Sequence, residues 1–162
     1  MEDDPRGAWT ELESLALNAN DSVIAIAAGG TTPYALGALA YCRRDGRTAE
    51  DAPLTALLTC ADPGVVEHAD HVLVLKTGPE VLTGSTRMKA GTATKLALNT
   101  ISTTLMVRSG RVYQNLMVDV RATNAKLRDR AARIIATLTG LDREACLALL
   151  DEAGGSVKVA VV

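Results

Sequence analysis

The sequence contains no phenylalanine, and aromatic residues make up only 2% of its 162 residues. Because hydrophobic residues still account for 48%, the core must be built from alanine, leucine, valine and isoleucine. Such side chains favour close packing of helices against strands. The length is that of one ordinary domain and suffices for a real core.

The sequence also lacks any run of basic residues. Its formal net charge is -2, and its lysines and arginines are scattered without an aromatic stripe. We therefore expect no nucleic-acid partner. No stretch reaches the roughly 18 to 20 uncharged apolar residues that a membrane span requires. The acidic start MEDDPR is unlike the basic start of a signal peptide. These features predict a cytoplasmic protein that spans no membrane.

Cysteine and histidine are both scarce. The three cysteines, Cys42, Cys60 and Cys146, lie far apart and lack CxxC spacing, so they predict neither a disulfide framework nor a zinc site. The two histidines, His68 and His71, flank the start of an expected strand, and their spacing does not indicate metal binding. We expect reduced cysteines and no metal.

The pattern of apolar runs predicts an α/β fold. Short, nearly continuous apolar segments at Val23–Ala28, 54–60 and 71–76 are typical of buried parallel strands. A helix should begin at Pro33 with Thr32 as its N-cap, and residues 61–70 leave room for only a turn or two of helix. This order predicts right-handed crossovers and a parallel sheet covered on both faces.

The rest of the chain is predicted to be helical. Residues 96–107 contain no charge, which predicts a mostly buried helix over about 86–109 that ends before Gly110. An amphipathic helix should follow and stop at Gly140, and Asp142 and Ser156 should cap two more. We expect a polar lead-in at 1–20, an incomplete sheet domain at 21–112, and a helical subdomain at 113–162 that ends within an unfinished helix.

Two loops have the composition of an anion-binding site. The segment AAGGTTP, residues 27–33, offers bare amides and two hydroxyls at a helix start. The segment GPEVLTGSTRMK, residues 78–89, offers hydroxyls together with Arg87 and Lys89. Neither segment matches a nucleotide-binding fingerprint. The alternative for the first loop is a purely structural strand-to-helix turn.

Two charged residues near these loops permit more than one interpretation. Glu80 precedes the hydroxyl-rich segment, so it could bind sugar hydroxyls, move a proton, or simply lie at the surface. Lys95 is better interpreted as a solvated or pocket-edge cation than as a nucleophile.

The segments GPEVLTGSTRMKAGTATKLALN and NLMVDVRATNAKL resemble the bacterial N-acetylmuramic acid 6-phosphate etherases, members of the sugar isomerase (SIS) superfamily that also resemble the glucokinase regulatory protein. The resemblance runs from about Asp21 to Val162. It implies a partial doubly wound αβα sandwich of the SIS type with a small helical subdomain after it. It also implies cleavage of the D-lactyl ether of N-acetylmuramic acid 6-phosphate without a cofactor, often in a homodimer.

The resemblance implies a phosphosugar site formed by both loops. The residues expected to bind the phosphorylated amino sugar are Gly29, Gly30, Thr31, Thr32, Glu80, Thr83, Gly84, Ser85, Thr86, Arg87 and Lys89. Asn115, Asp119 and Asn124 match the second segment, and capping is one role open to them. The first loop departs from the family pattern A-A-S-G-R-T-P, because Gly29 replaces its serine and Thr31 its arginine. Each lost charge-assisted hydrogen bond could weaken phosphate binding by ~1.5 to 3 kcal/mol.

The same resemblance implies that the family's amino-terminal half, with two strands, a phosphate loop and two proton-transfer glutamates, lies outside this sequence. The catalytic residues of this chain therefore stay unassigned. Three interpretations follow: an etherase part completed by another half, a non-catalytic phosphosugar-binding regulator, and a decayed product without activity.

Overall fold

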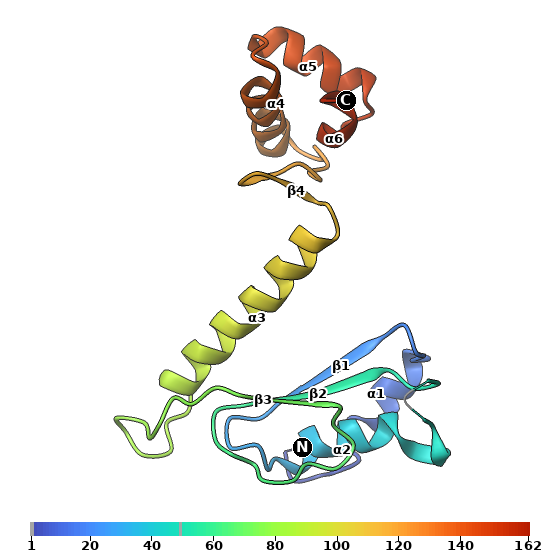
Figure 1. Cartoon of the computed structure of the whole chain (residues 1–162), viewed down its shortest axis with the longest axis vertical. Coiled ribbons are helices and arrows are strands. Elements are labelled where there is room, and N and C mark those ends of the chain that lie inside the picture. Colours follow the sequence, from blue (N-terminus) through green and yellow to red (C-terminus); the bar gives the residue numbers. More distant parts are fainter. Residues whose placement is uncertain (1, 49) are drawn as a thin grey trace. The chain divides into compact units, whose positions relative to one another are not determined.

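The structure is a computed structural model that describes residues 2–48 and 50–162. Its contacts divide the chain into two compact units, Met1–Asn99 and Thr100–Val162. Figure 1 shows the elements of each. The helix α3, Lys89–Arg108, belongs partly to both units.

The first unit contains a three-stranded parallel sheet in the order β1-β2-β3. Its strands are β1 (Ser22–Ile26), β2 (Leu54–Thr59) and β3 (His71–Val74). The ends of each strand differ from the predicted ends by at most two residues. Helix α2, Pro33–Cys42, packs on β1 and β2 through a small core in which Leu39 and Leu57 are fully buried. The α/β fold with a parallel sheet is thus confirmed.

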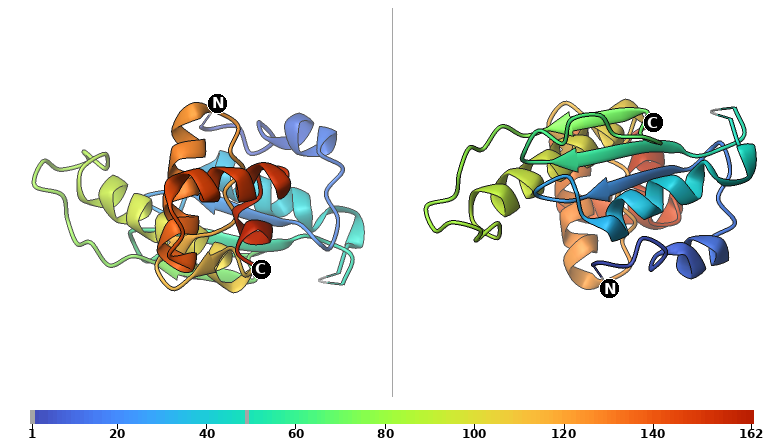
Figure 2. Two further views of the ribbon diagram at one scale, coloured as in Figure 1. Left: turned by 90° about the horizontal axis from the view of Figure 1, so that it is seen from above. Right: turned by 90° about the horizontal axis from the view of Figure 1, so that it is seen from below.

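The amino-terminal segment is more structured than a polar lead-in. Helix α1, Trp9–Ser14, packs against α2 on the same side of the sheet, as the views in Figures 1 and 2 show. The Trp9 indole N–H donates to the Gly37 carbonyl at 3.1 Å. Gly37 must be glycine, because a Cβ there would lie 1.7 Å from the carbonyl oxygen of Pro5. A short 3-10 turn, Arg44–Gly46, follows α2.

The sheet is covered on one face only in part. Ile24, Ile26 and Leu73 share the face opposite α2 by the parallel register, and they are 36%, 46% and 39% exposed. On this side the predicted cover is incomplete, because Ala56 and Leu58 of the middle strand are buried whereas these outer-strand side chains are not. The expected turn of helix between β2 and β3 is also absent, since residues 61–70 form bends and turns. Asp62 and Pro63 favour such a turn.

Helix α3 does not bear out the prediction of a mostly buried helix. Ala90 is the only buried residue among its described positions, and Leu96, Leu105 and Val107 are more than half exposed. The uncharged sequence of residues 96–107 makes the surface of the helix apolar, but a helix is buried only where another part of the protein packs against it. The helix ends as predicted, at Arg108 with Gly110 at φ 69° just beyond.

The second unit contains a hairpin and three helices. The hairpin pairs β4 (Val112–Tyr113) with β5 (Leu116–Met117) and was not predicted. The predicted amphipathic helix is α4, Ala125–Thr139, with Asn124 as its cap and Gly140 at its end. Asp142 caps α5 (Arg143–Glu152) and Ser156 caps α6 (Val157–Ala160), both as predicted. These helices enclose a core in which Ile135 and Leu150 are fully buried.

Candidate functional site

The first predicted loop lies where β1 passes into α2. Gly30 has a φ of 77°, a conformation that side chains rarely adopt. A Cβ at Gly30 would also lie 2.7 Å from the Pro63 Cβ and 2.9 Å from the Thr59 Oγ1. At Gly29, a Cβ would meet nothing closer than the Thr31 Oγ1 at 3.9 Å. Only the second glycine is therefore required by the backbone.

At the start of α2, the Thr32 hydroxyl does not cap the helix, whereas the Tyr34 amide is already hydrogen-bonded. Thr32 is the N-cap residue, as predicted, but its side chain makes no capping hydrogen bond. The amide of Tyr34 donates to the Glu2 carbonyl at 3.1 Å, a long-range contact that no local sequence pattern predicts. Part of the anion-binding capacity of this helix start is thus taken by the amino-terminal segment.

A pocket of about 530 Å³ lies beside this loop. Gly30 and Thr31 line it, together with Leu36 on α2 and the segment from Pro63 to His68. None of the predicted residues between 80 and 89 lines this pocket. His68 has a φ of 64°, and its Nε2 lies 3.9 Å from the Glu67 Oε2.

In the second loop, Glu80 is the cap of α3. One carboxylate oxygen accepts the amide of Lys89 and the other accepts that of Ala90, both at 2.9 Å. These backbone hydrogen bonds, with the charge of Lys89 as a smaller cause, lower the pKa of Glu80. A carboxylate held in this way stays ionised at neutral pH, so the geometry favours positioning over proton transfer.

The remaining residues of this loop form a sequence of tight turns. Gly84 has a φ of 79°, the amide of Ser85 donates to Leu82, and that of Thr86 donates to Gly84. Thr83, Thr86, Arg87 and Lys89 are exposed, whereas Ser85 is half-buried. Hydroxyls and cations thus stand at the surface just before α3.

Contacts at the carboxyl end of β2 bring the two loops to one edge of the sheet. The amide of Cys60 and the Thr59 hydroxyl both donate to the Ala28 carbonyl, at 2.9 and 3.2 Å. On the other side, the Cys60 thiol lies 3.6 Å from the Ala90 carbonyl and 3.8 Å from the Thr94 hydroxyl. The end of β2 therefore touches both the first loop and the first turn of α3.

Two of the three residues singled out in the second matching segment have local partners, and the third lies in a turn. The Asn124 side chain accepts the Leu127 amide, which is the capping role left open for it. Asp119 pairs with Arg111 at 3.4 Å. Asn115 lies in the β4–β5 turn, beside a second pocket that sequence analysis did not find.

Residues 2–48 and 50–162 contain neither a candidate metal site nor a candidate membrane-spanning helix. Within them, no three His, Cys, Asp or Glu side chains are grouped so that they could hold a metal ion. No described helix combines the length and apolarity needed to cross a membrane.

The three-stranded parallel sheet with α2 against it, and the helical unit that follows in the chain, make this an α/β protein and are consistent with part of a doubly wound αβα fold. Residues 114–153 match a family described as the C-terminal lid domain of glucokinase regulatory protein. This match covers the tip of the hairpin, α4, and α5 as far as Ala153.

Curated relatives identify the family more closely. The chain is 52% identical to the N-acetylmuramic acid 6-phosphate etherase of Gloeobacter violaceus and 51% identical to those of an Exiguobacterium strain and Deinococcus radiodurans. Each alignment covers 99% of this chain but only 51 to 53% of the relative. The chain belongs to this family and spans about half the length of the curated relatives it matches. The lid-domain match is consistent with their carboxyl-terminal portion.

Proposed function

We propose that this chain is the phosphosugar-binding part of an N-acetylmuramic acid 6-phosphate etherase and is inactive alone. The complete enzyme would cleave the D-lactyl ether to give N-acetylglucosamine 6-phosphate and D-lactate, in the recycling of cell-wall amino sugars in the cytoplasm. The relatives carry the name of that activity, and the chain matches about half of each.

The observation that carries the proposal is the position of Cys60 between the first loop and the start of α3, the helix that the second loop leads into. Its backbone amide bonds to Ala28 in the first loop, and its thiol bonds to Ala90 at the start of α3. Ligands of open parallel sheets bind beyond the carboxyl ends of strands. Both hydroxyl-rich loops meet that condition.

The proposed roles follow from the chemistry of each group. The hydroxyls of Thr31, Thr32, Ser85 and Thr86 would hydrogen-bond the phosphate and the sugar. Arg87 and Lys89 would offset the charge of the phosphate at its edge. Glu80 would hold the second loop on α3, because its carboxylate already accepts two amides of that helix.

We expect the chain to be inactive when alone because these two loops contain no suitable proton-transfer group. Elimination of the ether oxygen from carbon 3 needs a base that takes the proton from carbon 2, next to the carbonyl carbon, and an acid that protonates the leaving oxygen. Each such positioned group typically increases the rate ~100- to 10,000-fold. Glu80 is the only carboxylate of the second loop, and its depressed pKa makes it a weak base. A complementing amino-terminal half would supply these groups.

A complementing half, or a second copy of the chain in a homodimer, would also cover exposed apolar surface. Ile24, Ile26 and Leu73 stand on the open face of the sheet, and β1 and β3 are its outer strands within the described chain. Unpaired sheet edges and open apolar faces promote pairing with another polypeptide.

The test is reconstitution with the amino-terminal half of the Gloeobacter violaceus etherase, produced separately. Mixed with this chain, that half should release D-lactate from N-acetylmuramic acid 6-phosphate, whereas neither part alone should do so. Gly30→Ala should abolish the reconstituted activity, and Gly29→Ala should largely keep it. A stable, correctly sized complex that releases no D-lactate would refute the enzymatic proposal.

The second candidate is a phosphosugar-binding regulator without catalysis. The match of residues 114–153 to the lid domain of a regulatory protein favours it. Saturable binding of N-acetylglucosamine 6-phosphate, combined with no D-lactate release in the stable complex, would support this candidate.

A further inference from the structure

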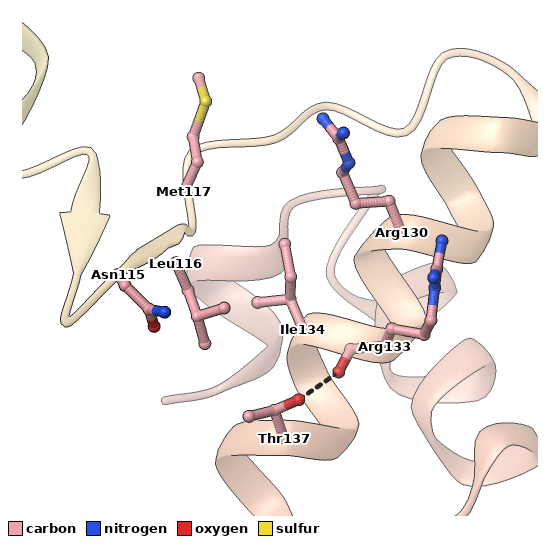
Figure 3. A pocket seen from close by; sticks show the side chains of 7 residues that line it. All are labelled: Asn115, Leu116, Met117, Arg130, Arg133, Ile134 and Thr137. Carbon is pink, nitrogen blue, oxygen red and sulfur yellow. Dashed lines mark hydrogen bonds between the residues drawn. The ribbon is translucent and has the colours of Figure 1, made fainter. Parts of the chain in front are cut away.

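A separate pocket lies wholly within the second unit, between the β4–β5 hairpin and α4. Its volume is about 380 Å³, and Figure 3 shows the side chains that surround it. From α4 it receives Arg130, Arg133, Ile134 and Thr137, whose spacing places them on one face of the helix. From the hairpin it receives Asn115, Leu116 and Met117.

The pocket combines cationic and apolar groups. The Arg130 side chain makes no hydrogen bond or ion pair with any described residue, and Arg130 is an exposed residue that lines the pocket. Arg133 pairs with Asp129 at 3.1 Å but keeps 75% of its side chain exposed. Ile134 is 8% exposed and, with Leu116, contributes the apolar part of the pocket lining.

The hydrogen-bonding groups suit a hydroxylated ligand. The Thr137 hydroxyl donates to the Arg133 carbonyl at 2.8 Å, so its oxygen remains able to accept from a ligand. The Asn115 amide can both donate and accept. Two guanidinium groups match a dianion with several oxygen acceptors, and the apolar part of the lining fits one face of a sugar ring.

The surrounding charge supports the same ligand class. Residues 100–162 carry nine lysines and arginines against six acidic residues, whereas residues 1–99 carry eight against thirteen. The nearby carboxylate, Asp129, is shared between Arg133 and Arg143. Its negative charge is therefore offset twice, while Arg130 keeps a full unpaired positive charge.

We propose that this pocket binds a small phosphate monoester of a sugar or another polyol. The phosphate lies between Arg130 and Arg133, and hydroxyls reach Asn115 and Thr137. This second site is formed by residues 115–137 alone, so it does not depend on the loops at the edge of the sheet.

The experiment is a titration of the ¹⁵N-labelled full chain, followed by NMR. The probes are inorganic phosphate, N-acetylglucosamine 6-phosphate, N-acetylglucosamine and D-lactate. The two phosphates should shift the resonances of Asn115 and the Arg130 and Arg133 side chains in a saturable way, the phosphosugar at lower concentration. The unphosphorylated sugar and the carboxylate should bind at least about tenfold more weakly, because a charge-assisted hydrogen bond to phosphate is lost.

Matched variants separate a site from general charge attraction. Arg130→Gln should weaken phosphosugar binding in this unit at least about tenfold. Arg143→Gln removes the same charge next to Asp129 but lies outside the pocket, and it should change the affinity less than about twofold. Equal weakening in both variants, or no saturable shift in this unit, would overturn the proposal.

The sheet-edge proposal is tested separately by the same spectra. Gly30→Ala should remove the shifts of Thr31 and Thr32 and leave those of Asn115 unchanged. Loss of the Asn115 response in that variant would show that the pocket is not an independent site and would refute this inference alone.

Discussion

The thiol of Cys60 lies 3.6 Å from the backbone carbonyl oxygen of Ala90, so the residue that follows β2 touches the first turn of α3. Thirty residues of chain separate them, and within that length lie β3 and the hydroxyl-rich loop. The contact fixes the start of α3 at the carboxyl edge of the sheet.

The two glycines of the first loop should respond differently to substitution. Gly30→Ala should lower the free energy of unfolding by about 1 to 3 kcal/mol, because of its positive φ and the close Pro63 and Thr59 atoms. Gly29→Ala should be nearly neutral, since Gly29 does not have a positive φ and its Cβ would meet only the Thr31 Oγ1, at 3.9 Å. Urea unfolding of both variants measures the contrast, and equal values would contradict the loop geometry.

Asp70 should be a main stabilising group at the opposite edge of the sheet. One of its oxygens accepts the amide and hydroxyl of Thr55, at 2.7 and 2.8 Å, and also contacts Arg43 at 2.6 Å. Asp70→Ala leaves the buried Thr55 groups without this partner, which should cost about 1 to 3 kcal/mol. The exposed Asp3→Ala is the control and should change the unfolding free energy by less than about 0.5 kcal/mol.

Asp70 should also make stability depend on acid. Its pKa falls from 3.8 to about 2, chiefly because the Thr55 amide donates to the carboxylate. The group therefore stabilises the fold above pH 4, and this contribution is lost as the pH falls toward 2. After allowance for solvent screening the contribution is about 1 to 2 kcal/mol. Unfolding of wild type and Asp70→Ala should differ less at pH 2 than at pH 6, and a constant difference would count against it.

Glu80 should stabilise the protein by capping the first turn of α3. Glu80→Ala should lower Tm and speed amide hydrogen exchange of Lys89 and Ala90, because both amides lose their acceptor. Since its pKa is lowered from 4.5, this stabilisation is present above that value and is lost as the pH falls through the lower folded value. Glu50→Gln, an exposed change in the same unit, should alter neither measurement. Unchanged exchange in Glu80→Ala would show that the cap is unimportant.

The apolar face of the sheet should mediate association. Ile26→Lys should keep the fold, because 46% of this side chain is already exposed. It should weaken assembly with the separately produced amino-terminal half at least about tenfold, as a charge would be buried at the interface. Analytical ultracentrifugation checks this, with Val65→Lys as a control at an exposed apolar residue outside the sheet. Equal assembly of wild type and Ile26→Lys would exclude this face.

Local sequence patterns predicted most of the elements and caps. The helix end at Gly140 and the caps Asp142 and Ser156 depend on only one or two neighbouring residues, so spacing along the chain predicted them, whereas capping by Asn124 was one of the roles left open. The three strands of the parallel sheet were equally visible because each is a short apolar run between turn residues, whereas the two-residue strands β4 and β5 are too short to show such a pattern. Helix capping and short apolar runs depend on neighbouring residues, so they can be recognised in a sequence without knowledge of the tertiary structure.

Long-range contacts escaped prediction. The bond from Tyr34 to Glu2 and the packing of Pro5 on Gly37 join segments about thirty residues apart, and no local pattern announces them. The burial of α3 was overestimated because an apolar sequence does not show whether a partner is present. For Glu80, its place nine residues before Lys89 could have suggested a cap only if the loop path had been known.

Direct observation of ligand binding at the two loops tests the central claim. In NMR spectra of the full chain, N-acetylglucosamine 6-phosphate should shift the amides of Thr31, Thr32, Ser85 and Thr86 together, along one saturable curve. Shifts confined to one loop, or none at millimolar ligand, would contradict a shared phosphosugar site at the carboxyl edge of the sheet.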